Sequence, residues 1–77
     1  MNPAALRGHL NASPFVPFEV HISDGGSLPV GHPDFMFFDR GKQEILIVSP
    51  DKTFHVVSVD SITRLTLRPP TKPANPR

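Results

Sequence analysis

Residues 44–59 read EILIVSPDKTFHVVSV and carry the clearest strand–turn–strand signal of the chain. The run Glu44–Val48 is rich in β-branched and aliphatic residues, which predicts a strand in the centre of a sheet. Ser49-Pro50-Asp51-Lys52 suits a type I turn, because proline presets the backbone angle of its second position. The run Thr53–Val59 then completes a β-hairpin.

Further short apolar runs with a period of two lie on both sides of this hairpin. Strand one is expected at residues 18–23, and Asp24-Gly25-Gly26 supplies the tight turn that follows it. Strand two, from Ser27 to about His32, contains Pro29 and must be an edge or a bent strand, because proline cannot donate to a ladder. The remaining runs with this pattern are residues 34–38 and 62–68.

The chain begins with a short helix and ends in a proline-rich segment. Asn2 can cap a helix that starts at Pro3, and Pro14 disfavours helical geometry before it, so a helix is expected over residues 3–12. Four of the last nine residues are proline, which predicts a basic, disordered tail at residues 69–77. Residues 1–68 are expected to form one small β-barrel domain.

Length and composition limit how this domain can be stabilised. The chain has 77 residues, ten prolines and no cysteine. A domain of this size buries only about 60% of its extended surface, and natural domains of this kind add disulfides, metals or oligomerisation. Because the chain has no cysteine, it can form neither disulfides nor thiolate metal sites. We therefore expect oligomerisation to supply the additional stability.

The charges are distributed unevenly along the sequence. Residues 1–64 hold five Lys/Arg and seven acids, whereas residues 65–77 hold three Lys/Arg and no acid. The net negative charge of residues 1–64 does not suit a protein that binds nucleic acid over a broad face. No stretch approaches the roughly 18 apolar residues of a membrane span, and no signal peptide is recognisable. We therefore expect a cytoplasmic protein with no membrane partner.

One short helix followed by five bent strands, with a tight turn before the last, resembles the SH3-like barrels and, within them, the Sm-like fold. The order of elements in residues 5–70 is similar to the bacterial Sm-like RNA chaperones (Hfq), with Gly31, the pair Phe38-Asp39 and Pro69-Pro70 at matching places. The resemblance implies an all-β, five-stranded antiparallel barrel. Where that family carries a basic–histidine pair, this chain has Val57-Ser58-Val59-Asp60, so the family's RNA site is not implied.

A more local resemblance comes from two motifs near the first strand. The first runs from Pro14-Phe15 to Asp24-Gly25, and the second is His32-Pro33-Asp34-Phe35. Both are similar to a group of short bacterial proteins without an assigned function. This resemblance implies no activity.

The sequence contains histidine, aspartate and serine residues, but their spacing does not match that of a known type of catalytic or metal site. The four histidines, His9, His21, His32 and His55, lack the local spacing of zinc ligands, although His21 and His55 could be neighbours across strands. His32 and Asp34 could serve acid–base chemistry with Ser23 or Ser27, yet they equally suit a turn around Pro33. We expect no enzyme, no metal and no cofactor.

The six phenylalanines indicate a contact surface. Phe18, Phe37 and Phe54 fit the core by their period, so Phe15, Phe35, Met36 and Phe38 cannot all point inward as well. Either the N-terminal helix covers those that point outward, or they form a patch for a partner or for self-association. Large exposed apolar areas are rare on monomers. The sequence therefore predicts a non-enzymatic interaction module that self-associates through strand edges and an aromatic patch. Its expected contact residues are Phe35, Met36, Phe38, Leu65 and Leu67.

The alternative is an Sm-like RNA-binding ring. In that case Arg64, Arg68 and Lys72 of the last strand and the tail would contact phosphates.

Overall fold

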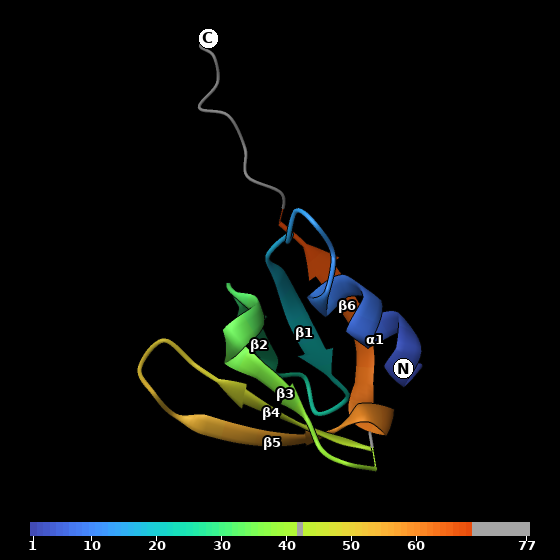
Figure 1. The fold of residues 1–77 in the computed structure, drawn as a ribbon. Helices are drawn as coiled ribbons and strands as arrows, with labels where there is room; N and C mark the ends of the chain where they lie inside the picture. Colours follow the sequence, from blue (N-terminus) through green and yellow to red (C-terminus); the bar gives the residue numbers. More distant parts are fainter. Residues whose placement is uncertain (42, 69–77) are drawn as a thin grey trace, which may run out of the picture.

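The computed structural model describes residues 1–41 and 43–68, and in them a short helix precedes two small antiparallel sheets (Figure 1). The elements in chain order are α1 (Pro3–Leu10), β1 (Phe18–Ile22), β2 (Ser27–Val30), η1 (Pro33–Phe35), β3 (Met36–Phe38), β4 (Glu44–Val48), β5 (Phe54–Ser58), η2 (Val59–Ser61) and β6 (Ile62–Leu67). The first sheet has the order β2-β1-β6 and the second the order β3-β4-β5.

The prediction of a five-stranded closed barrel is wrong. The described residues form six strands in two separate three-stranded sheets. The physical reason lies between β2 and β3, where Pro33 starts the 3-10 helix η1 and His32 Nδ1 accepts a hydrogen bond from the Asp34 amide at 3.1 Å. This capped turn interrupts what would otherwise be one long bent strand, and β3 joins the other sheet.

Two expectations about strand position are confirmed by the strand order. Strand β4 is the centre of its sheet, and β2 is an outer strand. The hydrogen bond from the Ile22 amide to the Gly26 carbonyl sets the phase of the β1–β2 ladder, so the backbone of Pro29 faces away from β1. Its missing N–H therefore costs no bond in the sheet.

The helix α1 begins where the sequence predicts and ends earlier. The Asn2 side chain accepts a hydrogen bond from the Ala4 amide at 2.7 Å, which caps the first turn. The helix stops at Leu10, not at residue 12. Leu6 and Leu10 lie on one face and are both buried, so α1 contributes to the core through that face.

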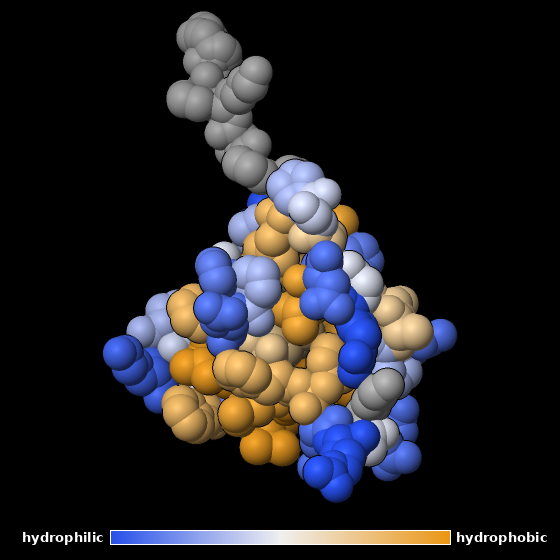
Figure 2. Space-filling model, in the orientation of Figure 1, coloured by the Kyte–Doolittle hydropathy of each residue, from blue (hydrophilic) through white to orange (hydrophobic). Residues whose placement is uncertain are grey.

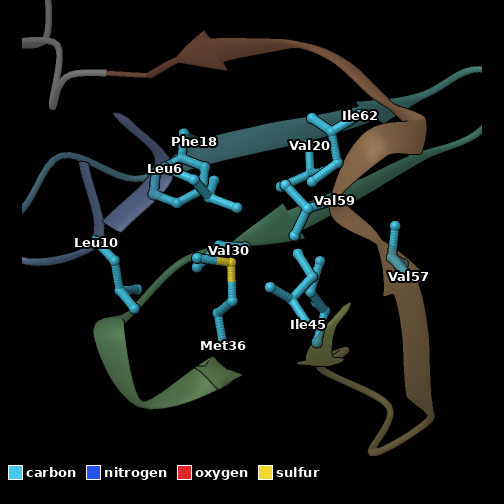
Figure 3. Close-up of a cluster of buried hydrophobic side chains, with 11 residues drawn as sticks. Leu6, Leu10, Phe18, Val20, Val30, Met36, Ile45, Val57, Val59 and Ile62 are labelled. Carbon is cyan, nitrogen blue, oxygen red and sulfur yellow. The ribbon is translucent and has the colours of Figure 1, made fainter. Parts of the chain in front are cut away.

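The core lies between the two sheets and α1, and side chains from all three point toward one another (Figure 3). Phe18 and Leu6 are fully buried beside each other on the α1 side. The buried set comprises Leu6, Leu10, Phe18, Val20, Val30, Met36, Ile45, Ile47, Val57, Val59 and Ile62.

Three of the sequence-based assignments to core and surface are reversed. Phe37 and Phe54, expected inside, are exposed, and Met36, expected as a surface contact, is buried. Strands β3 and β5 carry apolar residues on both faces, so the period of two does not say which face is inner.

The turn between β4 and β5 contains a residue in a strained conformation. The Lys52 amide donates to the Ser49 carbonyl at 2.8 Å, as a type I turn requires, and Lys52 itself has a φ of 71°. Left-handed backbone costs a residue with a Cβ about 1–2 kcal/mol, whereas glycine adopts it freely.

Replacing Lys52 by glycine is expected to stabilise the fold by about 1 kcal/mol, after the larger unfolded-state entropy of glycine is subtracted. In a domain this small, that gain corresponds to a rise of roughly 4–8 °C in Tm, measurable by circular dichroism. Lys52→Ala is the matched control, because it removes the same side chain but keeps the strain. Equal Tm values for the two variants would contradict the explanation.

Candidate functional site

The outer face of the β3-β4-β5 sheet, which points away from the core, is the most unusual surface of the protein. Because Ile45 and Ile47 of β4 are buried, alternation along the strand turns Leu46 and Val48 to the outside. Cross-strand partners extend this surface in two directions. We call it the outer apolar face, and it consists of Phe35, Phe37, Leu46, Val48, Phe54 and Val56.

The strand register joins these six side chains into one surface. Phe37 lies opposite Leu46, which lies opposite Val56, so one apolar row crosses all three strands. Val48 and Phe54 form the next row. Phe35, at the end of η1, shares a shallow hollow with Phe37, Val48 and Phe54.

Several large apolar side chains of the outer apolar face are exposed to solvent. The exposed fractions are 69% for Val56, 67% for Phe54, 49% for Phe37 and 41% for Phe35. Figure 2 shows apolar side chains gathered in the lower part of the molecule, where Figure 1 places β3, β4 and β5. With about 150–250 Å² per aromatic side chain, the exposed apolar area is on the order of 450 Å².

Charged groups lie at the two ends of this face. Asp39 and Glu44 line the hollow beside Phe37 and Val56 at one end. Asp34 and Lys52 line the hollow beside Phe35 and Phe54 at the other end. The apolar surface therefore has a polar border of mixed sign, an arrangement typical of a protein contact with an apolar centre and a polar rim.

The outer face of the β2-β1-β6 sheet provides an internal comparison, because it is polar. His21 Nε2 and Thr66 Oγ1 are 2.8 Å apart, and Arg68 donates to Glu19 at 2.6 Å. Antiparallel sheets commonly bury one face and expose a polar one, as this sheet does. A sheet that is apolar on both faces has instead the composition of an interior layer.

The contact residues expected from the sequence are dispersed in the structure. Of the five, only Phe35 belongs to the outer apolar face. Met36 is buried, and Phe38 is half-buried under the Arg7 guanidinium, whose carbon lies 4.9 Å from the ring centre. Leu65 and Leu67 lie on β6 of the other sheet. Two residues that the period of two assigns to the core, Phe37 and Phe54, belong to the outer apolar face, and no sequence signal singled out Leu46, Val48 and Val56.

Two basic residues of the RNA alternative, Arg64 and Arg68, come from β6 or directly follow it in the β2-β1-β6 sheet, not in the sheet that carries the exposed Phe37 and Phe54. Arg64 is exposed opposite His21, and Arg68 is engaged by Glu19. Lys72 and the predicted tail at 69–77 lie outside the described residues. The carboxylate beside Arg68 reduces the positive charge available to a phosphate on this face.

The contact with Arg68 gives a testable pKa. The hydrogen bond from the Arg68 guanidinium holds the pKa of the Glu19 carboxyl below its ordinary value of 4.5. Because the folded pKa is the lower one, the stabilisation is fully present above the unfolded pKa and is lost as the pH falls through the folded one. We expect Arg68→Met to return the Glu19 pKa to its ordinary range in a carboxyl NMR titration. An unchanged titration would show that the contact does not persist in solution.

The histidines do not form the arrangements considered above. His21 faces outward on the β2-β1-β6 sheet, whereas His55 lies in the other sheet and is half-buried, so the two are not neighbours across strands. His32 and Asp34 are 3.6 Å apart and largely exposed, and they form the turn at η1. Among residues 1–41 and 43–68, no three His, Asp or Glu side chains converge as metal ligands would.

Comparisons with known proteins leave the function open. No protein-family model matches the sequence, and no curated protein or solved structure matches it significantly. None of the helices in the described residues has the length and apolar character needed to cross a membrane.

Proposed function

We propose that this protein is a non-enzymatic interaction module that self-associates by packing its outer apolar face against the same face of a second copy. The single observation that carries the proposal is a three-stranded sheet that is apolar on both sides, with only one side covered by the core. Covering the second side removes that apolar area from water, which stabilises the assembly.

The size of the face suits an isologous dimer. A standard interface buries about 800 Å² per partner, and weaker ones less. The outer apolar face supplies on the order of 450 Å² of apolar area, and the charged border around it adds the rest. We therefore expect a dissociation constant in roughly the micromolar range.

The charged border favours one orientation of the two copies. When two sheets pack face to face with their strands antiparallel, the Lys52 end of one copy meets the Glu44 and Asp39 end of the other. The parallel orientation would bring Asp39 and Glu44 of one copy near the same two carboxylates of the other, with no lysine among the described residues that line that end. Attraction between unlike charges at the border thus supports the antiparallel dimer.

The outer edge of β6 offers a second route to self-association, the one expected from the sequence. Arg68 donates its amide to the Pro17 carbonyl, so alternation directs the backbone groups of Leu65 and Leu67 away from β1. These groups could pair with a strand of a neighbouring copy. Pairing of β6 with a different edge of the next copy is heterologous and would give rings or open assemblies, whereas β6–β6 pairing, like contact through the outer apolar face, gives a closed dimer.

Sedimentation velocity of the full chain over a range of concentrations, at low and high salt, tests the proposal. A monomer–dimer equilibrium that persists at high salt is expected, because apolar contacts are not screened. Assemblies larger than a dimer would favour pairing of β6 with a different edge of the next copy, and a dimer that Val56→Asp leaves intact would favour β6–β6 pairing. A protein that stays monomeric at millimolar concentration would refute self-association. Binding to an RNA oligonucleotide that weakens steeply with salt would favour the RNA-binding ring.

A further inference from the structure

A groove runs beside the outer edge of β5 and is separate from the centre of the outer apolar face. It has a volume of about 540 Å³ and lies between β5 and the hairpin that joins β1 to β2. Ile22 and Leu28 of the hairpin strands and Val57 of β5 provide apolar lining, and His55 is half-buried beside them.

The backbone of β5 presents unpaired hydrogen-bonding groups along this groove. The Ser49 amide donates to the Thr53 carbonyl and the Val59 amide to the Gln43 carbonyl, which sets the phase of the β4–β5 ladder. In an antiparallel ladder the residues between such bonded pairs point their N–H and C=O groups the other way. The main-chain groups of Phe54, Val56 and Ser58 therefore face away from β4, and no described strand pairs with them.

This edge also lacks the features that usually block pairing. The outer edge of β2 carries Pro29, and β3 is only three residues long. Strand β5 spans five residues without proline, lysine or arginine. Natural proteins protect exposed edges with such residues, so an unprotected edge beside a groove has the properties of a strand acceptor.

The charges around the groove indicate which side chains would fit. Asp24, at the hairpin end, brings the groove's only formal charge among the described residues apart from the titratable His55. No lysine or arginine of the described chain lines it. An occupant with a basic side chain near Asp24 and an aliphatic side chain over Ile22 and Leu28 would match both features.

We propose that the outer edge of β5 binds an extended segment of a partner protein, added as a further strand, whose groove-facing side chains, two residues apart, include an aliphatic and a basic one. The backbone of this segment would hydrogen-bond to Phe54, Val56 and Ser58. One aliphatic side chain would enter the groove, and a lysine or arginine would lie near Asp24. This goes beyond the proposed self-association, which uses the face of the sheet and leaves its edge open.

The probe is a capped heptapeptide of the sequence Thr-Val-Thr-Lys-Thr-Val-Thr, which carries its valines and its lysine on one face of the strand. Amide NMR shifts of the full chain at concentrations below dimerisation are the readout. We expect shifts confined to the amides of β5 and of residues 22–28. A peptide in which one valine is N-methylated at the pairing edge should bind about tenfold more weakly, because it loses a main-chain hydrogen bond without losing a side chain.

Two pairs of variants separate the backbone and charge contributions. Ser58 has a φ of −70°, so Ser58→Pro fits the fold while removing the outward N–H, and about tenfold weaker binding is expected. Ser58→Ala keeps the N–H and should bind as wild type.

Asp24→Asn keeps the oxygen that accepts from the Gly26 amide and should weaken binding severalfold at low salt only. Asp34→Asn is the matched control at a distant site.

Four outcomes would overturn the proposal. Equal affinity of the N-methylated peptide would exclude strand addition, and shifts centred on Phe37 and Leu46 would place the peptide on the outer apolar face. If the peptide dissociates a self-associated form that Val56→Asp leaves intact, the natural occupant of the edge is a second copy and not a partner protein. Absence of any shift at millimolar peptide would show that the edge is not an acceptor. The outcomes read from the peptide-induced shifts and affinities do not depend on whether the face-to-face dimer forms.

Discussion

Val56→Asp is expected to convert the self-associated protein into a monomer. Val56 lies in the apolar row with Leu46 and Phe37 and is 69% exposed in the isolated chain, so the fold tolerates a polar side chain there. In the dimer the same position is covered, and an unpaired carboxylate would lose its hydration. Because each interface contains two copies of the substitution, the dissociation constant should rise about 100-fold or more.

Sedimentation velocity and circular dichroism of Val56→Asp together check this prediction. Arg64→Asp is the matched control, because it places the same carboxylate at an exposed strand position on the polar sheet. We expect the control to sediment as wild type and both variants to remain folded. A Val56→Asp protein that still forms the wild-type assembly would show that the outer apolar face is not the contact. Loss of assembly in the control would instead point to β6.

Local signals predicted much of the fold correctly. These signals set the backbone conformation of their own residue or of residues within one turn. They are Pro50 in the β4–β5 turn, Asn2 before the helix, and the two glycines after Asp24. Such effects depend little on the rest of the molecule. The central position of β4 and the outer position of β2 followed from composition and from Pro29 in the same way.

The prediction of a closed barrel was wrong because it required β2 and β3, which are neighbours in the sequence, to continue as one bent strand. The sequence places Pro33 between two apolar runs, which is compatible both with a bend in one strand and with a break between two. The hydrogen bond between His32 and the Asp34 amide favours the break, and β2 and β3 enter different sheets. Strand closure is decided by tertiary packing, which periodicity does not report.

The outer apolar face could not be found from the sequence because its strands have no polar side. In β1, Glu19 and His21 mark the outer face, and the inner face follows from them. In β3 and β5 a shift of one residue exchanges two apolar faces, so Phe37 and Phe54 looked like core residues. The useful signal was the absence of alternation in residues 45–48, which is typical of a strand covered on both sides.

Phe18→Ala is expected to bring the free energy of unfolding close to zero at 25 °C. Phe18 is 1% exposed and packs against the rings of Phe15 and His9, whose centres lie 5.9 Å and 6.4 Å away. Removing a buried phenylalanine side chain costs about 3–5 kcal/mol in lost transfer free energy and cavity formation. Small domains have total stabilities near the lower end of about 5–15 kcal/mol, so little would remain.

Phe37→Ala is the matched control, because it deletes the same side chain from the outer apolar face. Urea denaturation at concentrations below dimerisation should show a loss of less than about 1 kcal/mol for Phe37→Ala, since Phe37 is half-exposed in the monomer. Above dimerisation the loss should grow, because the side chain is then covered and its removal weakens the assembly that stabilises the fold by mass action. Phe18→Leu should fall between the two. If Phe37→Ala were as destabilising as Phe18→Ala in the monomer, Phe37 would belong to the core and the outer apolar face would not exist as described.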